Sequence, residues 1–322
     1  MFANRNKLID KGFYYPLSGL RGCAHHNLAL ALNPKGSIRK QLKLEADDDV
    51  LIQRFIDEIS QRDERILVSS EGFQNINFNR NLAAKLSKVF PKEQTLIIIY
   101  IREQLDYLLS SYTQAVHARN VTLSLEEFEE EHFSADYYQF LQDWSAAFGV
   151  ENISVHIYDR QKLKNQNIID DFLDVLTLDQ VNFNTSLQNA NPSIGGNLLN
   201  FKRLLNQMDF NPKNSRKLYH VLEKLAEEHE KYRHKPQVSQ ELETRVRQKY
   251  RLSNQQTFKT YFKSQEDLFN YKSCTYQANP DLNTDLNQDI EEIIDFIGQK
   301  DISLVQTLAI EFAKKFTDKK NF

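Results

Sequence analysis

The stretch LIIIYIREQLDYLLSSYTQAV, from Leu96 to Val116, changes its pattern at Arg102. The residues before this arginine carry no charge and are mostly isoleucine, which is typical of a strand buried on both faces. Beyond Arg102, apolar residues recur at helical spacing, namely Leu105, Leu108, Leu109, Tyr112 and Val116. The stretch therefore predicts a strand followed by a helix, with a cationic side chain where the two meet.

Predicted strands and predicted helices follow one another throughout the first part of the chain. Short β-branched runs at 65–70, 95–101 and 152–158 predict strands, and amphipathic periods at 48–62, 80–90 and 136–148 predict helices. This order predicts an α/β fold with a mostly parallel central sheet and flanking helices. After about residue 189 the apolar spacing is helical only, so we expect a large helical C-terminal half.

The amino-acid composition of one segment near the C-terminus predicts the domain boundaries. Residues 273–288 are rich in Asn and Asp and include a proline, which is typical of a linker. We therefore expect one domain over residues 1–272, a linker over 273–288 and a C-terminal helical segment over 289–322.

Charge, cysteine content and hydropathy exclude several classes of protein. A formal net charge of -3 with mixed signs argues against a dedicated nucleic-acid binder. Two cysteines, Cys23 and Cys274, are too few for a disulfide framework or a zinc site and fit a reducing compartment, so we expect a cytoplasmic protein. The apolar runs are far shorter than the roughly 20 residues of a membrane span, and the polar start is unlike a signal peptide.

Polar side chains follow two of the predicted strands. Ser69, Ser70 and Glu71 end the first of them, and Arg102 follows the next. In parallel sheets ligands bind beyond the carboxyl ends of the strands, where helix N-termini favour anions. Ser110 lies roughly 12 Å beyond Arg102 along the predicted helix, so the two side chains can hold one ligand group between them. An arginine and a serine in this arrangement favour a phosphate.

This stretch is similar to part of a known family. IREQLDYLLSSY (residues 101–112) resembles the 3′-phosphate-binding motif of sulfotransferases that use 3′-phosphoadenosine 5′-phosphosulfate (PAPS). Five further blocks resemble bacterial sulfotransferase-family proteins in the same order, and the likeness covers residues 1–272. They are ILVSSEGF, FGVENISVHIYDRQKL, IIDDFLDVLTL, NPSIGGNLLNFKRLLNQ and YRLSNQQTFKTYFKSQEDLFNYK.

The resemblance implies a fold, a reaction and roles for particular residues. The fold would be like that of the P-loop NTPases. The reaction would move a sulfuryl group from PAPS to an acceptor hydroxyl without a metal, and the implied acceptor is a carbohydrate. Arg102 and Ser110 would hold the 3′-phosphate. Glu71 would be the base that accepts the acceptor proton, and His26, which follows His25, stands where relatives often show a histidine pair.

One part of the family pattern has no counterpart here. Such enzymes open with a strand and a Lys-x-Gly-Thr-Thr loop that holds the 5′-phosphosulfate. None of the nine glycines lies in such a setting, and MFANRNKLIDKGFYYP resembles the later part of the family's first helix and the following turn. Because that first strand is central in the family, we expect either a truncated product whose reading frame begins upstream, or a rearranged sheet.

Each candidate residue also has a purely structural interpretation. Arg102 can form a surface ion pair, Ser110 can be a small residue on a packed helix, and Glu71 can be a solvated carboxylate before Gly72. His25 and His26 can be core or cap residues. Two other function classes stay open: a non-catalytic protein that binds a nucleotide or a partner, and a glycosyltransferase or small kinase on a similar sheet.

Overall fold

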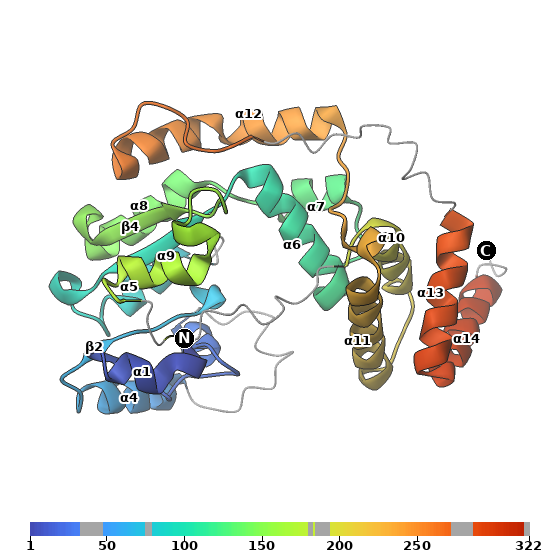
Figure 1. Ribbon diagram of the computed structural model, residues 1–322, viewed down its shortest axis with the longest axis horizontal. Coiled ribbons are helices and arrows are strands. Elements are labelled where there is room, and N and C mark those ends of the chain that lie inside the picture. The colour runs from blue at the N-terminus through green and yellow to red at the C-terminus, as the bar shows by residue number, and fades with distance from the viewer. Residues whose placement is uncertain (33–47, 75–78, 180–182, 184–193, 272–285, 319–322) are drawn as a thin grey trace. The chain divides into compact units, whose positions relative to one another are not determined.

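The structure is a computed structural model that describes residues 1–32, 48–74, 79–179, 183, 194–271 and 286–318 (Figure 1). The chain forms two compact units. The first comprises Met1–Arg102, Ser134–Ser186 and Tyr250–Asn270, and the second comprises Glu103–Phe133, Leu187–Lys249 and Tyr271–Phe322. Each unit therefore contains segments that are distant in sequence. The predicted domain boundaries at 272 and 289 stay a prediction, and most of the predicted linker lies outside the described residues.

Four short strands in the first unit form two parallel pairs. β1 (Phe13–Tyr14) pairs with β2 (Arg65–Ile66), and β3 (Ile97–Ile101) pairs with β4 (Ile153–Ile157). Among the described residues no ladder joins the two pairs, so the expected single central sheet is instead two separate sheets. The parallel direction is as predicted. β1 was not predicted, because two residues are too few to show an alternating pattern.

The two strand pairs share their apolar surroundings. On one side, Ile97 and Ile99 of β3 pack on a cluster that also holds Val68, just after β2. On the other side, Ile98 packs with Leu67 in a second cluster. Successive side chains of a strand point to opposite faces, so β3 contacts apolar clusters on both faces, and Phe13 of β1 belongs to the second of them. Contacts on both faces explain why Ile97, Ile98 and Ile99 are all apolar.

The helices of the first unit follow the predicted pattern. The predicted segments 48–62, 80–90 and 136–148 correspond to α4 (Asp48–Ile59), α5 (Asn79–Leu86) and α8 (Tyr137–Phe148). α8 ends at Gly149, whose φ of 88° favours glycine. The other helical elements are α1 (Arg5–Ile9), α2 (His26–Leu32), α9 (Ile168–Val175), the 3₁₀ helices η1 (Phe2–Asn4), η2 (Glu71–Gln74), η4 (Lys92–Gln94), η5 (Val150–Asn152) and η6 (Lys164–Gln166), and the π-helix η8 (Phe258–Phe262).

The described elements of the second unit are all helical, as expected for the C-terminal half. α7 (Leu125–His132) begins with a capping box, in which Ser124 and Glu127 satisfy each other's backbone N–H groups. α12 (Gln240–Thr257) contributes to both units, since residues from Tyr250 onward belong to the first. The remaining elements are α6 (Gln104–Arg119), α10 (Gly196–Leu205), α11 (Pro212–Glu228), η7 (Glu230–Arg233), α13 (Leu286–Lys300) and α14 (Ile302–Asp318).

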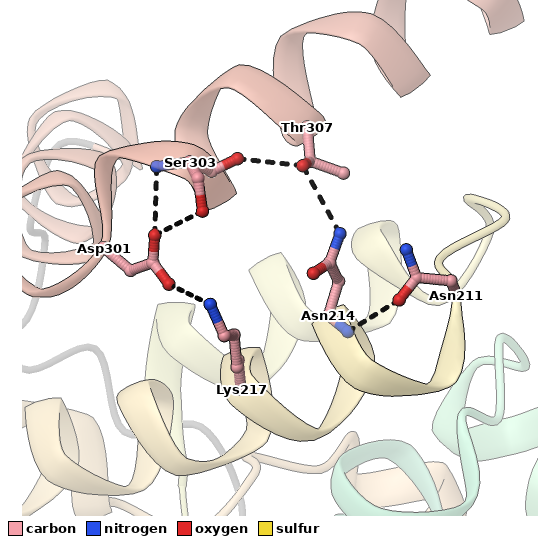
Figure 2. A network of polar contacts seen from close by, with 6 residues as sticks. All are labelled: Asn211, Asn214, Lys217, Asp301, Ser303 and Thr307. Carbon is pink, nitrogen blue, oxygen red and sulfur yellow. Dashed lines mark hydrogen bonds and ion pairs between the residues drawn. The ribbon is translucent and has the colours of Figure 1, made fainter.

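Polar contacts attach the junction of α13 and α14 to α11 (Figure 2). Lys217 Nζ lies 2.6 Å from Asp301 Oδ2. The same carboxylate accepts a hydrogen bond of 3.0 Å from the backbone N–H of Ser303, so Asp301 also caps α14. One turn further on, Asn214 Nδ2 lies 3.4 Å from Thr307 Oγ1. The last two helices are therefore part of the second unit and are fixed to it at their turn.

Candidate functional site

The segment after β2 meets the beginning of α2, although about 44 residues separate them in sequence. The ladder continues beyond β2, because Leu67 N–H donates to Tyr14 C=O at 2.8 Å. Ser69 C=O then accepts a hydrogen bond of 2.8 Å from the backbone N–H of His25. This backbone contact sets the two predicted groups side by side: the histidine pair and the Ser-Ser-Glu sequence.

His25 is fully buried, and both of its ring nitrogens are engaged. Nδ1 accepts from the backbone N–H of Ser69 at 3.3 Å, and Nε2 lies 3.0 Å from the carbonyl oxygen of Pro16, to which it donates. These partners fix the neutral imidazole with its proton on Nε2. Burial lowers the pKa of His25, although the two backbone contacts oppose the shift. His25 is therefore a core residue that joins two loops.

His26 differs from its neighbour because it is only partly buried and contacts a side chain. Its Nδ1 lies 2.9 Å from Ser70 Oγ, which also accepts a hydrogen bond of 3.0 Å from the backbone N–H of Gly72. Glu71 follows directly, is exposed and begins η2. The structure thus places His26 against Ser70, the residue that precedes Glu71 in the chain.

Close packing holds η2 against α2 beside this contact. A Cβ atom on Gly72 would lie only 2.8 Å from Cβ of Ala29 and 3.2 Å from Ser70 Oγ. Only glycine leaves room for this approach. A second anchor comes from Tyr15, whose hydroxyl lies 2.8 Å from Ser69 Oγ and 3.0 Å from the carbonyl oxygen of Cys23. The loop before α2 and the loop after β2 are therefore fixed to each other.

Arg102 directly follows β3 and is partly buried. The Tyr137 hydroxyl holds its backbone: the hydroxyl donates to Arg102 C=O at 2.6 Å and accepts from Arg102 N–H at 3.4 Å. Cζ of the guanidinium lies 5.5 Å from the ring centroid of Tyr158, which follows β4. An arginine held in this way at the carboxyl ends of a parallel pair is suited to an anion.

Ser110 is exposed on α6. Arg102 is the last residue of its segment in the first unit, whereas Ser110 belongs to the second unit. The predicted pairing of the two side chains therefore stays a prediction.

Sequence reasoning assigned no role to three residues of this region. Tyr137 and Tyr158 hold Arg102, and Ser70 joins His26 to the segment that carries Glu71. Ser70 had a signal, because it follows a predicted strand next to Glu71. The tyrosines had none, since their aromatic rings fit the apolar periods of the core equally well.

The described part of the chain contains no cluster of three or more His, Cys, Asp and Glu side chains arranged to hold a metal ion. Likewise, none of the described helices combines the length and the apolar character that crossing a membrane requires.

Comparison with known proteins gives one relative. A protein of Archaeoglobus fulgidus, described as uncharacterized, is 32% identical over 198 residues, which are 61% of this chain and 54% of that protein. The chain thus spans about half the length of this relative. No family model matches the chain. No solved structure matches it either.

Proposed function

We propose that this protein is sulfotransferase-like and transfers a sulfuryl group from PAPS to a hydroxyl group of an acceptor, most simply a carbohydrate. The observation that carries the proposal is the position of the candidate residues in the first unit. His26 contacts Ser70, the neighbour of Glu71, after β2, and Arg102 is held after β3. In parallel α/β folds these are the positions where ligands bind. The family resemblance of residues 1–272 supplies the reaction class.

The residues fit one part of PAPS better than another. Arg102 supplies a partly buried fork of donors for the 3′-phosphate, with Ser110 as its predicted partner. Glu71 and His26 supply two proton acceptors for the hydroxyl of the acceptor. The sequence offers no glycine-rich loop for the 5′-phosphosulfate, so we assign no residue to that group. PAPS supplies the sulfuryl group, and the residues assigned here bind and orient the 3′-phosphate and accept the acceptor proton.

Two arrangements of the chain support a fold like that of the P-loop NTPases. Both strand pairs are parallel, and Phe13 of β1 and Ile98 of β3 belong to one apolar cluster. In the family that the sequence resembles, the strand before the phosphate loop is central. Two parallel pairs that share their core but no ladder are the arrangement that a further central strand would complete.

The test is nucleotide binding by calorimetry. Hydrogen bonds to charged groups contribute about 1.5–3 kcal/mol, so Arg102→Ala should weaken binding of adenosine 3′,5′-bisphosphate roughly 10- to 150-fold. Adenosine 5′-monophosphate lacks the 3′-phosphate and should bind the wild type and the variant almost equally. Arg54→Ala is the matched control, because Arg54 is an exposed arginine on α4 in the same unit.

Three results are informative. Bisphosphate binding that Arg102→Ala leaves unchanged would remove Arg102 from the site. Bisphosphate binding without sulfuryl transfer to any carbohydrate would favour the non-catalytic binder. A thermal shift with ATP or a UDP-sugar but not with the bisphosphate would instead favour a small kinase or a glycosyltransferase.

A further inference from the structure

A row of polar side chains crosses one face of the β3–β4 pair and shares no residue with the candidate site. The parallel register sets Ser154 opposite Ile98 and His156 opposite Tyr100. Ile98 packs on the same cluster as Phe172 of α9, and side chains two apart on a strand share a face. Tyr100, Ser154 and His156 therefore lie on the face that α9 covers, and Asp171 of α9 meets them there.

His156 lies between a hydroxyl and a carboxylate. Its Nε2 is 2.8 Å from Ser154 Oγ, which is within hydrogen-bond reach. Its Nδ1 is 4.0 Å from Asp171 Oδ1, which is longer than a hydrogen bond. In the tautomer with its proton on Nδ1, the ring presents that proton toward Asp171 and accepts the Ser154 hydroxyl proton at Nε2. The order serine, Nε2, Nδ1, aspartate is that of a Ser-His-Asp triad.

Two donors fix the carboxylate of Asp171. The Tyr100 hydroxyl donates to Oδ1 at 2.7 Å, and the backbone N–H of Lys164 donates to Oδ2 at 3.0 Å. Burial and this contact with Asp171 raise the pKa of the Tyr100 hydroxyl, so it remains a donor at neutral pH. Asp171 also stands in the first turn of α9, where the helix dipole favours a negative charge. The Asp171 carboxylate beside His156 is therefore held in a fixed position.

The imidazole is in a suitable state and place to accept a proton. Burial lowers the pKa of His156, and the nearby Asp171 only partly opposes the shift, so the ring is neutral at pH 7. The His156 side chain is 28% exposed, and Ser154 is partly buried. A neutral histidine within hydrogen-bond reach of a serine satisfies the first geometric condition for an activated nucleophile, the contact between nucleophile and base.

We propose that Ser154 is a nucleophile activated by His156 and oriented through Asp171, with activated carboxylic or phosphonic esters as the substrate class. In the first step Ser154 Oγ bonds to the electrophilic carbon or phosphorus, and His156 Nε2 takes the hydroxyl proton. The bond to the leaving group breaks, and an alkoxide leaving group takes that proton and departs as the alcohol. This activity uses none of the residues assigned to sulfuryl transfer.

The proposal is tested by covalent labelling of the whole chain. A fluorophosphonate should react so that the Ser154 Oγ–P bond forms and fluoride leaves, and mass spectrometry should place the adduct on Ser154. Labelling of the wild type is by itself enough to contradict the proposal. If a large excess of the probe leaves Ser154 unmodified, or modifies Ser70 beside His26 instead, the proposal is wrong.

Variants then show whether Ser154 reacts because His156 activates it or only because it is partly exposed. Ser154→Ala should abolish the adduct, and His156→Gln should slow labelling about 10²–10⁴-fold, as for loss of a general base. Asp171→Asn should give a smaller loss. Ser60→Ala, which removes the exposed serine that directly follows α4, should label like the wild type. Thermal melting of each variant confirms folding, and equal labelling rates for the wild type and a folded His156→Gln would show that His156 does not activate Ser154.

Discussion

Glu58 on α4 organises the loop that leads to the candidate site. Its carboxylate accepts hydrogen bonds of 2.6 to 2.7 Å from the Tyr14 hydroxyl and from the backbone N–H groups of Leu17 and Ser18. Burial alone would raise the pKa of Glu58, but these hydrogen bonds outweigh it and lower the pKa to about 2. One side chain thereby fixes the chain segment that precedes His25 and His26.

We predict that Glu58→Gln reduces stability and its dependence on acid pH. A carboxyl group whose pKa is lowered by folding stabilises the native state above its unfolded pKa, here 4.5, and this contribution is lost as the pH falls toward about 2. At neutral pH the variant should lose about 1–2 kcal/mol, since the group is partly solvated. Urea unfolding at pH 7 and pH 3 measures both effects. A variant whose stability falls as steeply with acid as the wild type would assign the dependence to other carboxyl groups.

Among the helices, one residue in the turn between α13 and α14 makes two contacts that can be removed separately. Asp301 caps α14 through the N–H of Ser303, and it also pairs with Lys217 of α11 (Figure 2). Hydrogen bonds from Lys217 and Ser303 lower the pKa of Asp301 to about 2. The cap acts within one helix, whereas the ion pair joins two helices, so the two contacts predict different consequences when each is removed.

We expect Asp301→Ala to speed hydrogen exchange in the first turn of α14, because the cap and the ion pair are both lost. Lys217→Ala removes the ion pair and leaves the cap, so exchange there should change much less. Hydrogen exchange followed by mass spectrometry distinguishes the variants. Equal acceleration in both would mean that the ion pair, and not the cap, holds this turn.

At the scale of the whole molecule, the main question is whether the two strand pairs of the first unit fold together. The apolar cluster on which Ile97 and Ile99 of β3 pack also contains Phe55 of α4 and Trp144 and Phe148 of α8. Phe55 is fully buried, with its ring centroid 5.8 Å from that of Phe90. A cluster that joins helices beside both pairs should make their unfolding cooperative.

We therefore predict that Phe55→Ala destabilises the surroundings of Trp144. Removing a buried phenylalanine costs about 3–5 kcal/mol, and Trp144 is the single tryptophan of the chain, so its fluorescence reports on this cluster alone. The urea midpoint seen by fluorescence should fall. Leu252→Ala is the control, because Leu252 is 65% exposed and its loss should shift the midpoint little. An unchanged fluorescence midpoint in Phe55→Ala would show that the two pairs unfold independently.

The sequence by itself determined the local elements, because their signals come from neighbouring residues. Alternation and helical spacing predicted β3, β4, α4, α5 and α8, and the capping box of α7 depends on residues three apart. The same reasoning placed Glu71 and Arg102 after strands, where ligands bind in parallel folds.

Only the tertiary structure decided which distant groups meet. His25 and His26 are adjacent and chemically identical, yet one is a buried link between loops and the other faces Ser70. Their roles depend on packing against Ser69 and Ser70, which are 44 residues away, and no local pattern encodes such contacts. The same reason explains the two separate strand pairs and the row at Ser154, His156 and Asp171, because ladder pairing and contacts between elements are set by the enclosing core.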